Sequence, residues 1–425
     1  MHETAKQGAV TRFLTTAPPW LFALYGGLSS FAVYFAMFGY RKPFTAAAFS
    51  HPEGWPFAFD FKIALVIAQV AGYATAKFIG VKVISEMPGG KRAMGILTLI
   101  FGAQMSLLLF GALPTVIGPM ALYLNGLCLG MIWGLVFGFL EGRRLTEVLG
   151  AMLCASFILS SGVAKSVGKM LLLSNVDEKW MPAVSGLVFA PLMLIAVVAL
   201  AQLPPPSAAD EAERVKRAPM SRQDRIALFA AYAPALILLI AVYVILTALR
   251  DFRDNFSAEI WAELGFKNAA AIFTLSELPV AAIVLVGLAA LMGVKDNRRA
   301  VGFNIGFVAL GFVLLGASTL AYQLGVLAPV WWMILAGAGL YMGYTPFNAM
   351  LFDRMIAATG KVGTAGFLIY VADSFGYIGS ISLLLVKSFA KLDIAWGQFL
   401  AGGAYIACAL GLVGLFFANR FLRTL

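Results

Sequence analysis

The chain has 425 residues, of which 61% are hydrophobic and only 12% are charged, and its mean hydropathy is +0.88. A soluble domain carries about twice this share of charged residues, so the composition excludes a soluble fold. At roughly 35 residues for one membrane span and its loop, the length accommodates about twelve spans. The apolar stretches are long and unbroken, so we expect transmembrane helices and not the short alternating strands of a membrane barrel.

Apolar windows of about 19 residues, taken in chain order, predict twelve spans. The windows cover residues 20–47, 60–82, 93–112, 116–140, 145–172, 180–202, 227–250, 268–291, 300–322, 327–350, 362–387 and 394–418. A charged segment that opens with three prolines divides these spans six and six. We therefore expect an all-α integral membrane protein with two pseudo-symmetric six-helix bundles, over 1–202 and 227–425, joined by a central loop over 203–226.

The basic residues predict the orientation of these spans. If the central loop lies in the cytoplasm, most of the 31 Lys and Arg residues lie on cytoplasmic segments, and the positive-inside rule places both termini there. The net charge of +10 then faces anionic lipid and requires no nucleic acid partner. The first 17 residues have no apolar core, so we expect no signal peptide. The predicted location is the bacterial inner (plasma) membrane.

Cysteine and histidine usage argues against metal chemistry. Cys128, Cys154 and Cys408 lie inside apolar stretches without CxxC spacing, and the two histidines, His2 and His51, lie outside the predicted spans. A zinc site and a histidine proton relay within the membrane are therefore not expected. The sequence also has no phosphate-cradling loop. We expect a monomer without a cofactor or a metal, and not an enzyme.

An offset of 212 residues relates parts of the two halves. It aligns Tyr40-Arg41-x-x-Phe44 with Phe252-Arg253-x-x-Phe256, and Glu141 with Asp353. Because half the chain is about 212 residues long, this offset indicates a parallel duplication of a six-helix unit, as in one large class of transporters.

Two basic turns carry the resemblance to a known superfamily. Residues 80–92 follow the second predicted span and contain Glu86, Lys91 and Arg92, and residues 293–299 follow the eighth and contain Asp296, Arg298 and Arg299. With the six-plus-six layout, these turns resemble the paired cytoplasmic signature of the major facilitator superfamily. The resemblance implies secondary transport by alternating access, with these six residues in a gating or conformational role.

A narrower resemblance lies in the first predicted span. Tyr40-Arg41-Lys42-Pro43-Phe44 resembles the arginine-lysine-x-phenylalanine segment of the organophosphate:phosphate antiporters. That family places one arginine from each half over the substrate phosphate, which implies this role for Arg41. In its seventh span the arginine is followed six residues later by tryptophan. Here Arg250 is followed by Phe256, whereas the repeat offset selects Arg253, so both arginines remain candidates.

Arginines within spans also require a physical explanation. A charged side chain at the centre of a lipid-exposed helix costs about 2.5–3.5 kcal/mol or more, so intramembrane arginines indicate a cavity, a counter-ion or a ligand. Alternatively, Arg41 and Arg250 reach the interface, and Arg250 pairs with Asp254 four residues on. The planar guanidinium suits bidentate binding of phosphate or carboxylate, and Lys165 can add a third positive charge. Further candidates for the cavity wall are Tyr40, Asn125, Trp133, Tyr344 and Asn348.

Two acids, Glu277 and Asp373, lie deepest within predicted spans. Either can carry a coupling proton, and either can instead balance a buried base. The sequence thus predicts a secondary active transporter for a small organic anion, phosphorylated, phosphonate or carboxylate, coupled to protons or to exchange for a counter-anion. The alternatives are an integral-membrane enzyme acting on a lipid-linked substrate and a transporter-like sensor.

Overall fold

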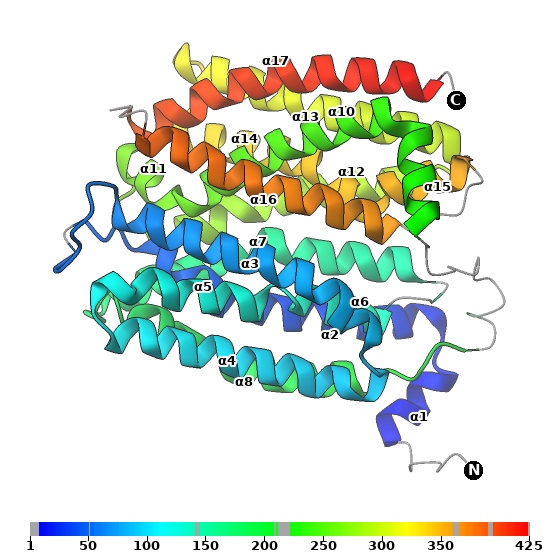
Figure 1. Cartoon of the computed structure of the whole chain (residues 1–425), viewed down its shortest axis with the longest axis horizontal. Helices are drawn as coiled ribbons and strands as arrows, with labels where there is room; N and C mark the ends of the chain where they lie inside the picture. The colour runs from blue at the N-terminus through cyan, green and yellow to red at the C-terminus, as the bar shows by residue number, and fades with distance from the viewer. Residues whose placement is uncertain are drawn as a thin grey trace.

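A computed structural model describes residues 8–50, 52–140, 143, 145–207, 210, 222–359, 365–389 and 394–423, and over these ranges it contains helices and no strand (Figure 1). His2, His51, Glu141 and residues 208–209 and 211–221 of the predicted central loop lie outside the described residues.

The spans of the first half follow a short helix, α1 (Ala9–Thr16). They are α2 (Pro19–Arg41), α3 (Phe61–Glu86), α4 (Arg92–Ala112), α5 with α6 (Gly118–Leu129 and Ile132–Leu140), α7 (Thr146–Leu173) and α8 (Met181–Ala201). Short 3-10 turns lie at η1 (Pro43–Ala46), η2 (Gly89–Lys91) and η3 (Thr115–Ile117).

The second half has the same number of spans. They are α10 (Arg222–Asn255), α12 (Ile272–Met292), α13 (Asn297–Gln323), α14 (Pro329–Pro346) continued by η4 (Phe347–Leu351) and α15 (Phe352–Thr359), α16 (Ala365–Phe389) and α17 (Trp396–Arg423). A short helix, α11 (Ser257–Glu263), follows α10.

Twelve spans result, as predicted. Within the described ranges, eleven helices are long and apolar enough to cross a membrane, and α14 with η4 and α15 provides the twelfth. The helix α14 is not one of these eleven, and its 18 residues include two prolines, two tyrosines and two tryptophans. Pro346 has no N–H to donate, and the π-helical turn η4 follows it, which is where a proline disturbs the regular ladder.

Helix packing separates two bundles. In the first, α2 packs against α7 and α8 and α3 against α5, and in the second, α10 packs against α16 and α17 and α13 against α14. The bundles meet where α7 contacts α12 and where α3 contacts α16. The predicted all-α fold with twelve helices in two bundles is confirmed.

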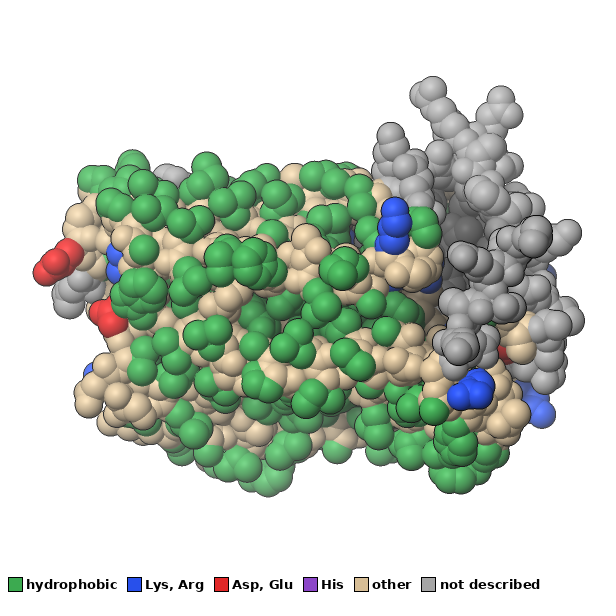
Figure 2. All heavy atoms as spheres, turned by 90° about the horizontal axis from the view of Figure 1, so that it is seen from below, with side chains coloured by type: hydrophobic (Ala, Val, Ile, Leu, Met, Phe, Trp, Pro, Cys, Tyr) green, Lys and Arg blue, Asp and Glu red, His purple; other side chains and the backbone are tan. Residues whose placement is uncertain are grey.

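The molecule has two distinct ends along its helix axes (Figure 1). The first and last described residues lie at one end, on the right of the figure, which we call the terminal end. The turn η1 and the helix α11 lie at the opposite end, which we call the far end. Between the ends, apolar side chains cover most of the face in Figure 2, with charged side chains near its margins. This belt matches a lipid-facing surface.

The first bundle depends on close helix contact at two glycines. A β-carbon on Gly72 of α3 would lie 2.0 Å from the carbonyl oxygen of Tyr123, and one on Gly126 of α5 would lie 2.1 Å from the carbonyl oxygen of Gln69. Beside this crossing, Gln69 donates to Asn125 at 2.8 Å. Because these two glycines have no side chains, α3 and α5 can approach each other closely. This contact lies on the side of α3 that faces away from the second half.

Candidate functional site

A small cavity lies between the two bundles, with a free volume of about 60 Å³. This space is enough for a few water molecules. Its walls come from α2, α3, α6 and α7 of the first half and from α10, α14, η4 and α16 of the second. The lining residues are Tyr34, Phe38, Arg41, Lys42, Tyr73, Lys77, Trp133, Phe157, Arg250, Asp251, Asp254, Tyr341, Tyr344, Asn348, Ile369, Asp373 and Tyr377.

Arg41 reaches the cavity from the last position of α2. The helix ends there because Pro43 cannot continue the hydrogen-bond ladder. The guanidinium carbon of Arg41 lies 4.2 Å from the centre of the Tyr73 ring, and its Nε is buried without a hydrogen-bond partner. Among the residues that the structure describes, no carboxylate forms an ion pair with Arg41. An anion in the cavity would supply the missing partner.

Arg250 faces the same cavity from the second half. Its guanidinium carbon lies 3.7 Å from the centre of the Tyr344 ring, and it pairs with the adjacent Asp251 at 2.7 Å. Arg253, the other candidate, does not line the cavity. It is buried against α12 and α14, where it pairs with Glu277 at 2.9 Å and donates to the carbonyl oxygen of Met333. The structure therefore brings Arg250, and not Arg253, to the cavity with Arg41.

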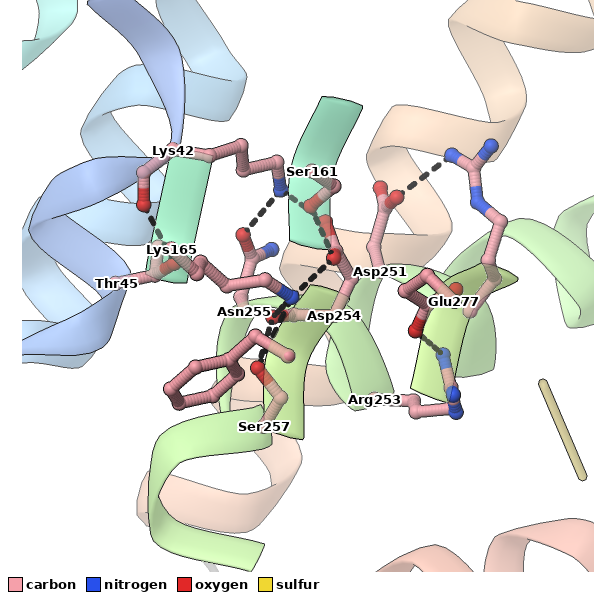
Figure 3. Close-up of polar contacts among 12 residues, drawn as sticks. Lys42, Thr45, Ser161, Lys165, Asp251, Arg253, Asp254, Asn255, Ser257 and Glu277 are labelled. Atoms are coloured by element: carbon pink, nitrogen blue, oxygen red, sulfur yellow. Dashed lines mark hydrogen bonds and ion pairs between the residues drawn. The ribbon is translucent and has the colours of Figure 1, made fainter. Parts of the chain in front are cut away.

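Asp254 joins three helices at the far side of the cavity (Figure 3). Lys42 lies 2.5 Å from one of its carboxylate oxygens, and Lys165 of α7 lies 2.7 Å from the other. Ser161 donates a further hydrogen bond to Asp254. One carboxylate of the second half thus holds two lysines of the first. The alternative pairing of Arg250 with Asp254 is absent, and Lys165 lies behind the cavity wall.

A second ion pair crosses between the halves at the far end. Lys62 lies 2.5 Å from Glu259 of α11 and donates to the carbonyl oxygen of Thr45. Burial raises the pKa of the Glu259 carboxyl above its ordinary value, although Lys62 beside it acts in the opposite direction. The far side of the cavity is therefore closed by buried charge pairs.

Asp373 lies on the wall of the cavity that α16 forms. One of its carboxylate oxygens accepts a hydrogen bond from the Tyr243 hydroxyl, and the other lies 3.4 Å from the Lys77 ammonium of α3. Asn348 donates to the oxygen of Tyr243 at 3.2 Å. Glu277, the other deep acid, lies outside the cavity in its pair with Arg253, and both residues of that pair belong to the second half.

The charges around the cavity do not balance. Four bases line it, namely Arg41, Lys42, Lys77 and Arg250, and Lys165 adds a fifth from behind the wall through its pair with Asp254. The acids are three, namely Asp251, Asp254 and Asp373. Two positive charges remain in excess. The described residues thus form an electropositive cavity that favours an anion.

The other predicted site residues divide into two groups. Trp133, Tyr344 and Asn348 line the cavity, whereas Tyr40 and Asn125 do not. Asn125 is fully enclosed and donates to the carbonyl oxygens of Tyr40 and Ala103, which holds α5 against α2 and α4.

The two basic turns lie at the terminal end, away from the cavity. Arg92 donates to the carbonyl oxygen of Gly138, and Lys91 is exposed. Asp296 caps α13 by accepting from the backbone of Arg299 at 2.8 Å. Arg298 and Arg299 are exposed. The side chain of Glu86 lies outside the described part of the chain.

Sequence reasoning did not select several charged residues of the cavity. These are Lys42, Lys77, Asp251 and Asp254. Lys77 is a charged residue within a predicted span, 60–82, and a systematic search for such residues would have found it. Asp251 and Asp254 follow the predicted end of the seventh span at residue 250, because α10 continues to Asn255.

Comparison with protein families identifies one family. A model of DUF5690, described as a family of unknown function, matches residues 43–424. The chain therefore belongs to this family. A search of curated proteins found no match.

Solved structures resemble the chain over nearly its full length. A D-xylose-proton symporter has a TM-score of 0.63 at 13% identity, covering 95% of this chain and 97% of that chain. A bacterial homologue of the human lysosomal transporter Spinster, inward-facing and unoccupied, has a TM-score of 0.63 at 12% identity, covering 96% and 98%. The human organic anion transporter MFSD10 has a TM-score of 0.57 at 15% identity, covering 97% and 100%. The chain thus has the major facilitator fold.

Proposed function

We propose that this protein is a secondary active transporter that moves a small organic anion across a membrane by alternating access. The observation that carries the proposal is the pair Arg41 and Arg250, which face one cavity from opposite halves. Arg41 forms no ion pair with any described carboxylate, and its Nε is buried without a partner. A half-buried guanidinium whose Nε has no partner and that lacks a counter-ion is costly, so a bound anion would stabilise this arrangement.

The chemistry of the cavity favours a substrate with a compact anionic group. Two guanidinium groups can each give two parallel hydrogen bonds to phosphate, phosphonate or carboxylate. The excess of two positive charges around the cavity fits a dianion. The resemblance of the Arg41 segment to the organophosphate:phosphate antiporters agrees with this class, and the human neighbour MFSD10 is described as an organic anion transporter.

Transport would follow from relative movement of the two bundles. In this structure the far side of the cavity is closed by the pairs that Asp254 and Glu259 form with lysines of the first half. Separation of these pairs, with closure at the other end, would expose the same cavity to the opposite compartment. The energy would come from a cotransported proton or from exchange for a second anion.

The remaining parts of the proposal concern the cellular setting. The positive-inside rule favours a bacterial inner membrane with both chain termini in the cytoplasm. We further propose a monomer that needs neither a metal nor a cofactor. The basic turns, with Glu86, Lys91 and Arg92 in one and Asp296, Arg298 and Arg299 in the other, would act in conformational change at the cytoplasmic end.

Ligand-dependent stability tests the anion site directly. Purified protein is melted in the presence of phosphorylated, phosphonate and carboxylate metabolites, because a ligand that binds the native state raises the apparent melting temperature. We expect one of these classes to stabilise the protein. The same compounds are then tested for uptake into proteoliposomes.

Matched arginine variants connect the result to the cavity. Arg41→Lys and Arg250→Lys keep the charge but remove the fork, so both should lose most of the stabilisation and uptake while keeping their unliganded melting temperature. Arg253→Lys is the matched control, because Arg253 lies on the same helix outside the cavity. Normal anion binding by Arg41→Lys and Arg250→Lys would show that the cavity is not the anion site.

A further inference from the structure

Asp373 is less tightly paired than the other acid that joins the two halves beside the cavity. The Lys77 ammonium lies 3.4 Å from Asp373, whereas the two lysines on Asp254 lie 2.5 and 2.7 Å away. Asp373 nevertheless has only 6% of its surface exposed. It is therefore a buried carboxylate whose charge depends on one cation from the opposite half.

Tyr243 determines which oxygen of Asp373 faces that cation. The Tyr243 hydroxyl donates to one carboxylate oxygen, and Asn348 donates to the oxygen of Tyr243, so the phenolic hydrogen is directed at Asp373. The second carboxylate oxygen of Asp373 therefore faces Lys77 and the cavity. Tyr243, Asn348 and Asp373 all belong to the second half, so this arrangement can persist when the halves move apart.

The other groups near Asp373 do not offer a competing proton site. The titratable residues that line the same cavity or flank Asp373 are Tyr34 and Arg41 on α2, Lys42 directly after it, Tyr73 and Lys77 on α3, Tyr243, Arg250, Asp251 and Asp254 on α10, Tyr341 and Tyr344 on α14, and Tyr370 and Tyr377 on α16. Tyrosines are neutral near pH 7. Asp251 has a closer cation, Arg250 at 2.7 Å, and accepts from Ser380 at 2.8 Å. Asp254 holds Lys42 and Lys165 at 2.5 and 2.7 Å, so both acids have closer cations than Asp373 has. Asp353 and Arg354 of α15, which also contacts α16, lie outside the cavity wall.

We infer that Asp373 takes up one proton when the substrate anion binds, and that Lys77 couples the two events by changing partner. The inference deepens the proposed function and rests on it. In the empty cavity the Asp373 carboxylate neutralises Lys77. An anion that contacts Lys77 leaves the carboxylate buried without its counter-ion and beside a second negative charge, which is unfavourable.

Protonation removes this conflict with balanced charge. The Asp373 carboxylate and one proton become a neutral carboxylic acid, while Lys77 keeps its own proton and pairs with the anion. Release of the anion on the other side of the membrane returns Lys77 to Asp373, and the acid gives up its proton there. One anion therefore crosses with one proton, which is symport. Glu277 is not the coupling group, because its partner Arg253 is in the same half and outside the cavity.

The inference predicts a pH dependence of anion binding. Because proton and anion each favour the binding of the other, affinity should rise as pH falls, by up to about tenfold per pH unit while Asp373 titrates. Sulfate is the probe, since its charge is constant between pH 5 and 8. Its affinity is measured from the rise in melting temperature with sulfate concentration, in buffers whose ionic strength is held equal with sodium chloride.

Variants identify the residues that are responsible for the pH dependence of anion binding. Asp373→Asn mimics the protonated acid, so it should bind sulfate at least as tightly as wild type does at low pH, with no pH dependence. Tyr243→Phe removes a hydrogen bond to the carboxylate, so the midpoint of the pH profile should move upward, which loss of packing alone would not cause. Glu277→Gln is the matched control, a buried acid outside the cavity, and should keep the wild-type profile.

A variant with both charges removed protects the test from a folding defect. Lys77→Met combined with Asp373→Asn leaves no unpaired charge, so it should fold and bind sulfate without pH dependence even if Asp373→Asn alone is unstable. Sulfate binding that is independent of pH in the wild type, or that keeps its pH dependence in Asp373→Asn or in the double variant, would overturn proton coupling while leaving the anion site intact. A wild-type protein that no anion stabilises would overturn both the proposed function and this inference.

Discussion

Replacement of Asp254 by asparagine should both destabilise the protein and loosen its far end. Asp254 is the shared partner of Lys42 and Lys165, at 2.5 and 2.7 Å, and all three side chains are buried. Removal of one partner from a buried ion pair costs about 3–5 kcal/mol, because a charge is left without compensation. Asparagine keeps an oxygen that can accept from Ser161, so we expect a loss near the lower limit, about 3 kcal/mol.

Two measurements separate general destabilisation from opening of the far end. The free energy of unfolding is obtained by titration with a denaturing detergent. Opening is followed with a water-soluble maleimide on Ala46→Cys, in a background without Cys128, Cys154 and Cys408, in detergent solution where both ends are accessible. Ala46 has only 3% of its surface exposed, in the turn η1. A loss of about 3 kcal/mol can raise the open population by up to about a hundredfold, so labelling should become at least tenfold faster.

Glu277→Gln is the matched control for Asp254→Asn. It breaks a buried pair of similar length, Arg253 with Glu277 at 2.9 Å, but both residues belong to the second half. We expect comparable destabilisation without faster labelling of Ala46→Cys. Equal labelling rates in wild type and Asp254→Asn, or equal acceleration by Glu277→Gln, would refute the view that Asp254 holds the two halves together.

Three further predictions concern packing, pH and topology. Gly72→Ala should lower the melting temperature sharply or prevent folding, because the added β-carbon would lie 2.0 Å from the backbone oxygen of Tyr123. Gly302→Ala is the control, because the space around Gly302 is open, and it should have little effect in the same melting experiment. Lys62→Met should destabilise the protein more at pH 8 than at pH 5. Burial already raises the pKa of Glu259, and the carboxyl without its lysine is buried at lower cost when it is protonated. An equal loss in melting temperature at both pH values would contradict this. Cysteines at Ser207 and Asp177 should label from opposite sides of the membrane in intact cells and inverted vesicles, with Ser207 reacting from the cytoplasm, and the reverse pattern would overturn the predicted orientation.

The fold was predictable because hydropathy reports a one-dimensional property of the chain. Each of the twelve apolar windows corresponds to a span, including the weakly apolar window at 327–350 that contains α14. The helix ends were less predictable. The first window continued to residue 47, whereas α2 stops at Arg41, two residues before Pro43. The seventh stopped at residue 250, whereas α10 continues through a charged turn to Asn255.

That charged turn explains why part of the site was missed. Arg250 and Asp251 enter the protein interior as a pair within α10, and Asp254 does so because lysines of the first half neutralise it. Hydropathy of a single segment does not register such partners. Lys42 is an example: in sequence it is a base beside a helix end, and only the folded structure shows that it is buried on Asp254 of the other half. Intramembrane charge was thus a usable signal for location but not for pairing.

The internal repeat also gave an incomplete guide to the cavity. Its offset aligns Arg41 with Arg253, but the residues of α10 that line the cavity are 250, 251 and 254. At about 100° per residue, Arg253 points roughly 100° away from the centre of that group, toward α12 and α14. Duplication preserves the order of helices, whereas the rotation of one helix about its axis decides which arginine faces the substrate space.

The two halves differ in the sign of the charges that they contribute to their shared interface. In every ion pair between the halves that the described residues form, the base is a lysine of the first half and the acid belongs to the second: Lys42 and Lys165 with Asp254, Lys62 with Glu259, and Lys77 with Asp373. Under the proposed function, a substrate anion would carry the same sign as these acids and would compete with them for the bases of the first half. Binding of an anion would therefore weaken these ion pairs between the halves, while Arg41 and Arg250 would contact the anion from both halves.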